Sequence, residues 1–224
     1  MTAAGRGPVF PRDLSAERGM LFRITHRDNL PWLLANGLPC ASAPLRAPGF
    51  APIGKPGLIE DRAQRRVRLP PGGTLADYVP FHLTPMSPML LNIKTGWSGV
   101  IQRPPDEIAV LVSSIGAMQA HGVTLLFTDR HACMATARWS ADPADLATMI
   151  DWEILRRHDF TRSDDYPDKK DRYQAEALAH GHVPVGALLG IGCHSAREQA
   201  RIQEIVTEAG LNLPVARRQN WYFP

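Results

Sequence analysis

The chain has 224 residues, of which 44% are hydrophobic, and this is enough for one domain with a substantial core. Its 20 prolines and 18 glycines are typical of a fold with many turns and long loops, and they argue against a helical bundle. The formal net charge of +3 permits an acidic partner without requiring one.

Other features of the sequence bear on its compartment and its domain organisation. The three cysteines are far apart and form no CxxC pair, which favours a reducing compartment over a disulfide scaffold. No apolar run approaches the roughly 20 residues that span a bilayer, and the N-terminus lacks a signal-peptide pattern. We therefore predict a cytoplasmic protein without a membrane segment. Residues 1–20, rich in Gly, Pro and Arg, are predicted to form a flexible arm before a single domain at 21–224.

The first predicted elements are a strand and a helix with a histidine between them. Residues 21–25 alternate between apolar and polar side chains, which is the pattern of a half-buried strand. A helix follows, with Asp28 as a plausible N-cap and Gly37 as its stop. His26 lies at the junction, where it is either a binding residue or a histidine that bonds a neighbouring carbonyl.

Residues 38–76 form a long segment that we predict to be irregular, because glycine–proline turns interrupt it repeatedly. It contains an arginine cluster made of Arg62, Arg65, Arg66 and Arg68. Such a cluster is either a solvated face or a phosphate-binding group, since a guanidinium can bond phosphate in a bidentate way.

Apolar runs and capping signals place the elements in the middle of the chain. Strands are predicted at residues 78–85, 108–112 and 123–127. Helices are predicted to begin near residue 87 and to cover 113–121, 129–138 and 145–155.

The C-terminal third begins with a glycine-punctuated strand predicted at 183–191. Ser195 and Glu198 form a capping box, and the apolar spacing that follows predicts a packing helix ending at Gly210. The tail at 215–223 joins arginines to three aromatic residues. It is either a last strand with its core anchor or a surface that stacks bases.

Glu176 is the strongest candidate for chemistry. It is the only acid in the uncharged run 174–179, and a charged, proline-containing loop at 162–170 precedes it. A carboxylate rarely lies in such a run without a partner. The alternative is a surface helix on which Glu176 faces water, because the run has good helix propensity.

Several common motifs are absent. The chain has no GxxxxGK[ST] loop, no GxGxxG opening a βαβ unit and no nucleophile elbow. His180, His182, Cys193 and His194 match no strong zinc template, and we expect no metal.

Five stretches taken together resemble one family, the DarT family of DNA ADP-ribosyltransferase toxins. They are residues 21–30, 73–81, 87–90, 128–131 and 173–176. Each is weak alone, but their order is specific, and the similarity runs from about residue 20 to the C-terminus.

The resemblance implies an α+β ADP-ribosyltransferase fold, with a split, mostly antiparallel β core and peripheral helices. It implies that NAD binds in the cleft between two sheets as the donor of ADP-ribose for a base of single-stranded DNA. It also implies a partner, a macrodomain antitoxin (DarG) that removes the modification. Met86, where thymine-modifying members tend to have arginine, favours guanine as the target, with thymine as the alternative.

The resemblance also assigns roles to residues. Glu176 is the catalytic carboxylate, and Arg62 matches the catalytic arginine that bonds the pyrophosphate, with Arg65 in reserve. The NAD site would also include His26, Asn29 and Tyr78, with Tyr78 stacked on nicotinamide.

The DNA side of the site is expected in the segment that leads to Glu176. The loop 162–172 would hold the target base. The residues expected to contact DNA phosphates are Arg156, Arg157, Lys169, Lys170 and Arg172. Two other functions remain open at this point: an RNA- or protein-directed ADP-ribosyltransferase, and a catalytically silent nucleic-acid-binding module.

Overall fold

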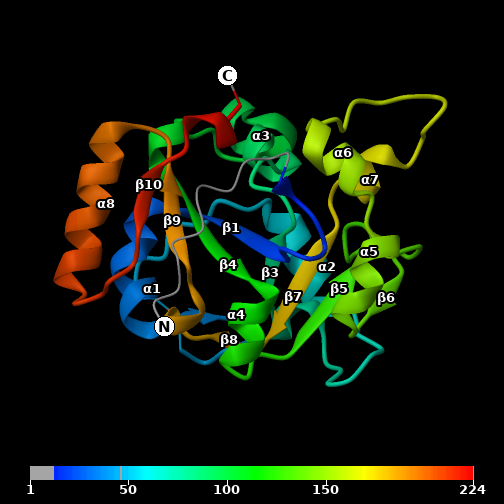
Figure 1. Cartoon of the computed structure of the whole chain (residues 1–224), viewed down its shortest axis with the longest axis horizontal. Coiled ribbons are helices and arrows are strands. Elements are labelled where there is room, and N and C mark those ends of the chain that lie inside the picture. The colour runs from blue at the N-terminus through cyan, green and yellow to red at the C-terminus, as the bar shows by residue number, and fades with distance from the viewer. Residues whose placement is uncertain (1–12, 46, 224) are drawn as a thin grey trace.

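The computed structural model describes residues 13–45 and 47–223. An eight-stranded sheet crosses the molecule in the order β10-β9-β4-β1-β3-β7-β5-β6, and helices lie around it (Figure 1). All neighbouring strands are antiparallel except β9 and β10. The strands of this sheet are β1 (Met20–His26), β3 (Tyr78–His82), β4 (Ile108–Ser114), β5 (Leu125–Thr128), β6 (Trp139–Ser140), β7 (Glu176–His180), β9 (Gly190–Cys193) and β10 (Val215–Arg217).

Helices flank the sheet at both ends (Figure 1). A small second sheet pairs β2 (Leu38–Pro39) with β8 (His182–Val183). The helices are α1 (Leu30–Asn36), α2 (Pro56–Gln64), α3 (Pro88–Thr95), α4 (Ile115–Ala120), α5 (Leu146–Met149), α6 (Trp152–Arg157), α7 (Lys169–Arg172) and α8 (Ala196–Glu208).

The large sheet is split between β1 and β3. β1 pairs with β4 along seven residues, but its register with β3 is a single pair, Phe22 with His82. Two four-stranded halves therefore meet at one bridge. This is the split, mostly antiparallel core that the sequence led us to expect.

The buried strands were predicted best. β1, β3, β4 and β5 overlap the predicted strands; β1 was predicted from alternation, whereas β4 and β5 are apolar runs that pack on both faces of the sheet. The helix after Ser195 is also confirmed, and the Ser195 side chain accepts a hydrogen bond from the Glu198 amide.

The helix predicted at 129–138 is wrong, because side chains close this segment into a loop. The Asp129 carboxylate accepts from the Arg138 amide at 2.9 Å and also binds the Arg130 guanidinium. The Thr128 hydroxyl donates to the Arg130 carbonyl at 2.7 Å. Asp and Thr compete with the helical backbone in this way.

Three other predictions need correction. The irregular segment 38–76 contains a nine-residue helix, α2. The helix at 145–155 is two helices, α5 and α6, with extended backbone at Ile150 between them. The strand at 183–191 is interrupted by a 3-10 turn at Val185–Ala187.

The tail is a core anchor, and the base-stacking alternative is wrong for its two buried aromatic residues. Trp221 and Tyr222 are buried, with Trp221 edge-on to Phe22 and the Tyr222 hydroxyl donating to the Ile108 carbonyl. The remaining aromatic residue, Phe223, is partly buried and packs against the same core.

The structure describes only part of the expected N-terminal arm at residues 1–20. Residues 1–12 lie outside the described part of the chain. Leu14 is buried in the main core, and β1 already begins at Met20. Packed structure therefore begins before the expected boundary at residue 20.

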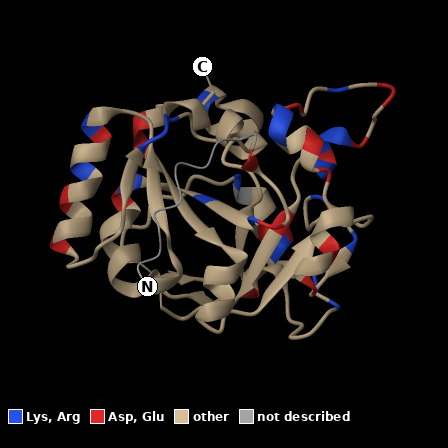
Figure 2. Cartoon of the chain, viewed as in Figure 1, with Lys and Arg blue, Asp and Glu red and all other residues tan. Residues whose placement is uncertain are grey.

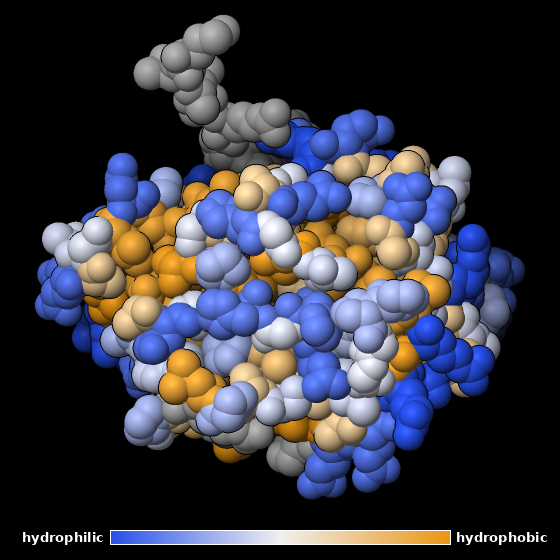
Figure 3. Space-filling view, turned by 90° about the horizontal axis from the view of Figure 1, so that it is seen from below, coloured by the Kyte–Doolittle hydropathy of each residue, from blue (hydrophilic) through white to orange (hydrophobic). Residues whose placement is uncertain are grey.

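Among the described residues, no helix is long and apolar enough to cross a membrane. On the face seen in Figure 3, polar side chains are interspersed among the apolar ones.

Candidate active site

Glu176 is the first residue of β7, between two neighbouring strands. It pairs in register with His82 of β3 and Thr128 of β5. Its exposed fraction is 3%. Glu176 is therefore a buried strand residue, and the alternative of a water-facing helix is wrong.

Arg62, in the last turn of α2, is the direct partner of Glu176. Its Nη1 donates to both carboxylate oxygens of Glu176, at 3.2 and 3.1 Å. Its Nη2 is buried and has no hydrogen-bond partner among the described residues. Half of the guanidinium fork is thus occupied, and the other half can bind an oxygen of a substrate.

Two histidines complete this group, and sequence reasoning gave neither of them a role. The His131 Nε2 lies 3.8 Å from a Glu176 oxygen. His82 is the register partner of Glu176 on β3. The stretch 128–131 signalled the family without pointing to His131, and His82 carries no local signal because a lone histidine in a strand has no distinctive pattern.

The carboxyl group of Glu176 is ionised at neutral pH. Burial by itself raises its pKa, but the charge of Arg62, those of His131 and His82, and the Arg62 hydrogen bond together bring the pKa below its ordinary value. Burial lowers the pKa of His82 to about 4, so His82 is neutral near pH 7. Arg62 is therefore the main counter-charge of Glu176.

Arg23 on β1 is a second cation near this group, and sequence reasoning missed it as well. Burial and the charge of Arg62 lower its pKa to about 10, against the opposing effect of Glu176, so it stays protonated. It donates to the Pro80 carbonyl at 2.9 Å.

His26 lies at the other end of β1 from the Phe22–His82 bridge. The Asp28 amide donates to its Nδ1 at 3.2 Å, so in the neutral ring the proton is on Nε2, which lies 3.3 Å from the Glu107 carboxylate. His26 lies four residue steps along the strand from Phe22, or about 13 Å. His26 and Glu176 therefore lie at different places along the split.

Asn29 and Arg65 hold loops in place. The Asn29 amide donates to the Ala51 carbonyl at 3.0 Å and accepts from the Ala51 amide at 2.8 Å, which fixes the chain before α2. Arg65 donates to the Met134 carbonyl at 3.2 Å. Of the two arginines considered for the catalytic role, Arg62 is therefore the one that reaches Glu176.

Tyr78 does not present a stacking face, which corrects our expectation. Its exposed fraction is 1%, its hydroxyl donates to the Gly72 carbonyl at 2.8 Å, and its ring meets His180 edge-on. Tyr78 packs in a small hydrophobic cluster with Val67 and Leu75. Successive side chains of β3 point to opposite faces of the sheet, and that of Tyr78 points toward this cluster.

The expected DNA-binding cations gather near α6 and α7 (Figure 2), but most have partners. Lys169 is only 8% exposed and binds Asp159 at 2.8 Å, which corrects its assignment to DNA phosphates. Arg156 and Arg157 pair with Glu153, and Arg172 pairs with Asp168. Lys170 is exposed, and no ion pair involves it in the described part of the chain.

The loop before Glu176 is attached to its surroundings at several points. The Tyr166 hydroxyl donates to Asp151 at 2.6 Å, and the Tyr173 hydroxyl to the Met86 carbonyl at 2.9 Å. Asp168 contacts Arg130 at 3.3 Å. Met86, which guided the expectation of a guanine target, thus touches the segment that leads into Glu176.

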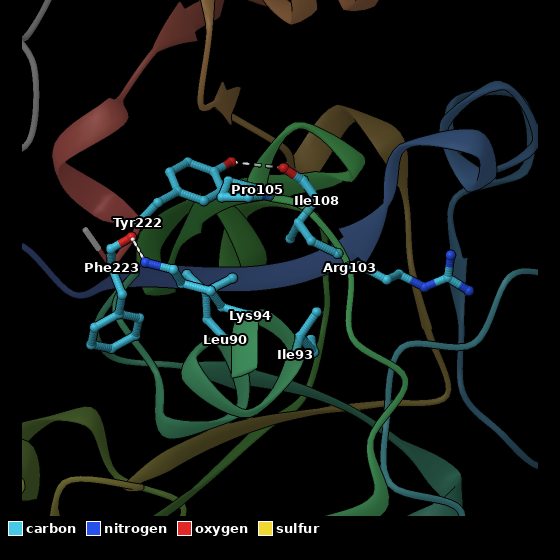
Figure 4. Close-up of a pocket in the computed structure, with 8 residues that line it drawn as sticks. All are labelled: Leu90, Ile93, Lys94, Arg103, Pro105, Ile108, Tyr222 and Phe223. Atoms are coloured by element: carbon cyan, nitrogen blue, oxygen red, sulfur yellow. Dashed lines mark hydrogen bonds between the residues drawn. The ribbon is translucent and has the colours of Figure 1, made fainter. Parts of the chain in front are cut away.

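A separate small cavity lies under the C-terminal tail, where Lys94 donates to the Phe223 carbonyl and Tyr222 to that of Ile108 (Figure 4). Its volume of about 10 Å³ suits a single water molecule and excludes a nucleotide.

No group of three potential metal ligands occurs within residues 13–45 and 47–223. Of the residues considered for zinc, His182 contacts the Asn36 carbonyl and His194 contacts Asp106.

Comparison with known proteins connects this geometry to a family. The family model described as "ssDNA thymidine ADP-ribosyltransferase, DarT" matches residues 22–223. A "DNA ADP-ribosyl transferase" of Escherichia coli O127:H6 (strain E2348/69 / EPEC) is 42% identical over 216 residues, covering 96% of this chain and 98% of that protein. One of Thermus sp. (strain 2.9) is 32% identical, covering 91% and 95%.

Solved structures agree with these relationships. "Thermus sp. 2.9 DarT in complex with ADP-ribosylated ssDNA" superposes with a TM-score of 0.82 at 30% identity, covering 92% of this chain and 97% of that one. The complex of the same protein with NAD+ gives 0.78 at 29% identity, covering 92% and 98%. "Thermosipho africanus DarTG in complex with ADP-ribose" shares the fold, with a TM-score of 0.73 at 17% identity, covering 91% and 51%.

Proposed function

The chain belongs to the DarT family and is an NAD-dependent DNA ADP-ribosyltransferase, and we propose that it uses Glu176 to transfer ADP-ribose from NAD to a thymine of single-stranded DNA. The observation that carries this proposal is the buried, ionised Glu176 held by the half-occupied fork of Arg62. The similar Thermus structures contain NAD+ in one case and ADP-ribosylated single-stranded DNA in the other.

The chemistry follows from the charges. When the bond between nicotinamide and the ribose C1 breaks, its electron pair leaves with nicotinamide, and positive charge develops on the ribose. An ionised Glu176 stabilises that charge, and it does so best in a buried site that needs no reorganisation. The free Nη2 of Arg62 would bind an oxygen of the pyrophosphate.

The second half of the reaction joins the ribose C1 to a base nitrogen. That nitrogen must lose a proton, and Glu176 is the nearest ionised carboxylate in the group described above. A flipped or unpaired base reaches such a buried site at least cost, which favours single strands as the substrate.

Thymine is our choice of base over the guanine that Met86 favoured. The support is the thymidine-directed description of a family model that matches residues 22–223, against one residue position. Thymine reacts through a ring N–H, which suits a site with an ionised carboxylate ready to accept the proton.

The test uses the purified protein, NAD and oligonucleotides in which only one base type can react. We expect a mass gain of one ADP-ribose on the thymine oligonucleotide, mapped to the base, and no gain with Glu176→Gln. Labelling of only the guanine oligonucleotide would restore the guanine assignment. Labelling of RNA or protein without DNA would overturn the single-stranded DNA substrate.

We further propose a macrodomain antitoxin as partner and the cytoplasm as location. The family resemblance supports the partner, and three free thiols fit a reducing compartment. A macrodomain hydrolase added to the labelled oligonucleotide is expected to restore its original mass, and a persistent adduct would count against this partner.

A further inference from the structure

Trp97 and Ile101 are the two most exposed large hydrophobic residues in the described part of the chain, at 70% and 63%. They lie on the segment 96–103 between α3 and β4. Gly96, Ser98 and Gly99 there have positive φ angles of 72°, 62° and 78°. This tight turn presents Trp97 to solvent. A solvent-exposed indole on an ordered turn offers a face on which a base can stack.

The turn is held in place from both sides. The Lys55 ammonium donates to the Ser98 hydroxyl at 2.9 Å, and Gln102 donates to the Lys94 carbonyl at 3.0 Å. The Arg103 amide bonds the Ile93 carbonyl at 3.0 Å. The backbone that carries Trp97 is therefore ordered before any ligand arrives, which lowers the entropy cost of binding.

A cation that forms no ion pair among the described residues binds this turn at Ser98, next to Trp97 in the sequence. Lys55 is exposed, and none of the ion pairs among the described residues includes it. Its hydrogen bond to Ser98 is to a neutral group, so the charge stays available. The exposed acids of α2, Glu60 and Asp61, lie more than one turn further along the helix.

The position relates this surface to the active site. Lys55 is the N-cap of α2, seven residues before Arg62, which corresponds to about 10 Å along the helix axis. At the other end of the segment, Arg103 contacts the Glu107 carboxylate that also contacts His26. The turn that carries Trp97 is therefore joined through Ser98 to the start of α2, and the axial distance from there to Arg62 corresponds to about three stacked nucleotides.

We propose that Trp97 stacks on a base of the DNA strand next to the modified base, while Lys55 contacts the adjoining phosphate. This inference rests on the proposed function. Exposed aromatic side chains on which bases stack, combined with cations that contact the backbone, are the means by which proteins hold single strands without reading their sequence. The adenine of NAD fits less well, since Trp97 projects into solvent whereas the donor must reach the buried Glu176.

The experiment compares Trp97→Ala, Trp97→Phe and Lys55→Gln with Leu189→Ala, a matched control at a residue that is 46% exposed outside the segment. For Trp97→Ala we expect the KM for single-stranded DNA to rise about 5- to 100-fold with the KM for NAD unchanged. Trp97→Phe should stay within about threefold, because it keeps a stacking face. Lys55→Gln should reduce the slope of log affinity for DNA against log salt concentration by about one, the value for one lost phosphate contact.

An abasic scan gives a second, independent test of the stacking contact. Oligonucleotides with one abasic nucleotide at each position near the target are assayed with the wild type and with Trp97→Ala. One position should weaken the wild type and leave the variant unaffected. The absence of any such position would overturn the stacking contact.

Other outcomes are distinguishable. A raised KM for NAD in Trp97→Ala would mean that Trp97 stacks on the adenine of NAD. Unchanged KM values for both substrates would mean that the surface binds a protein partner instead. Either result overturns the inference while wild-type labelling of DNA upholds the function. Failure of the wild type to label any DNA would overturn both.

Discussion

The carboxylate of Glu176 is the residue on which the proposed chemistry depends most. Glu176→Gln keeps the side-chain volume and removes the negative charge. We expect single-turnover transfer to fall by about two to four orders of magnitude, the range for loss of a key electrostatic group. Transfer near the wild-type rate would show that another group stabilises the ribose cation. Circular dichroism of the variant is the control for folding.

The geometry of Arg62 is as important as its charge. An ammonium group cannot bond both oxygens of Glu176 and also a substrate oxygen in a planar fork. We therefore expect Arg62→Lys to remain strongly impaired, with a raised KM for NAD and an unchanged affinity for single-stranded DNA. A loss of DNA affinity with a normal KM for NAD would place Arg62 on the DNA side.

His82 should make folding stability depend on pH. Its pKa is lowered to about 4 in the folded chain, against an unfolded value near 6.5. Below pH 6.5 the unfolded chain binds more protons, so stability should fall as pH drops from 6.5 to 4, by roughly 1 to 3 kcal/mol. The lowered pKa of Glu176 acts in the same direction at lower pH.

Melting temperatures measured from pH 7.5 to 4 check this expectation. His82→Gln cannot be protonated, so its melting temperature should decline less between pH 6.5 and 5 than that of the wild type. Parallel curves for the two proteins would mean that His82 is not the group responsible.

At the scale of elements, α7 contains two lysines with opposite expected effects. Lys169 forms a partly buried pair with Asp159, and the hydrogen bond from Lys169 is the main cause that lowers the pKa of Asp159 to about 2. Lys169→Ala should lower the melting temperature by a few degrees. Lys170→Ala should leave it unchanged and weaken binding of all single-stranded oligonucleotides about equally. A lowered melting temperature for Lys170→Ala, or weakened DNA binding for Lys169→Ala without a change in stability, would contradict these roles.

Arg130 connects two segments that border the site. It binds Asp129 through two bonds of 3.2 Å and reaches Asp168, just before α7, at 3.3 Å. We expect Arg130→Gln to loosen the loop before Glu176, seen as faster limited proteolysis there. The coupling with Asp168→Asn in a double-mutant cycle should be about 0.5 to 1 kcal/mol, because Asp168 is partly exposed. Additive effects would argue against this link.

α2 and the loop at 129–138 show where element prediction failed. α2 has mixed polar and apolar residues with no clear apolar stripe, so its periodicity resembles that of a loop. In the loop, side-chain bonds from Asp129 and Thr128 override a sequence with ordinary helix propensity. Both segments border the active site, which is where local rules and tertiary structure most often disagree.

For the whole molecule, the sequence was sufficient to predict β1, β3, β4 and β5, but it predicted neither β6 nor β7 as a strand, and it singled out Glu176 as a candidate. A lone acid in an apolar run has a local signature, whereas Arg62 and Glu176 are 114 positions apart in the sequence and are brought together only by the folded sheet. His82, His131 and Arg23 were missed because their roles arise from register and strand order. Tyr78 was misassigned because alternation along β3 does not reveal which face meets the ligand.

The position of Glu176 at the first residue of β7 also has a consequence for the timescales of motion. β7 is hydrogen-bonded to β3 on one side and β5 on the other, while the preceding loop is attached through side chains. Amide hydrogens from Glu176 to His180 should exchange with deuterium on the slow timescale of global unfolding, and those at 162–166 far faster. The carboxylate is thus fixed on a rigid support while the adjoining chain is free to adapt.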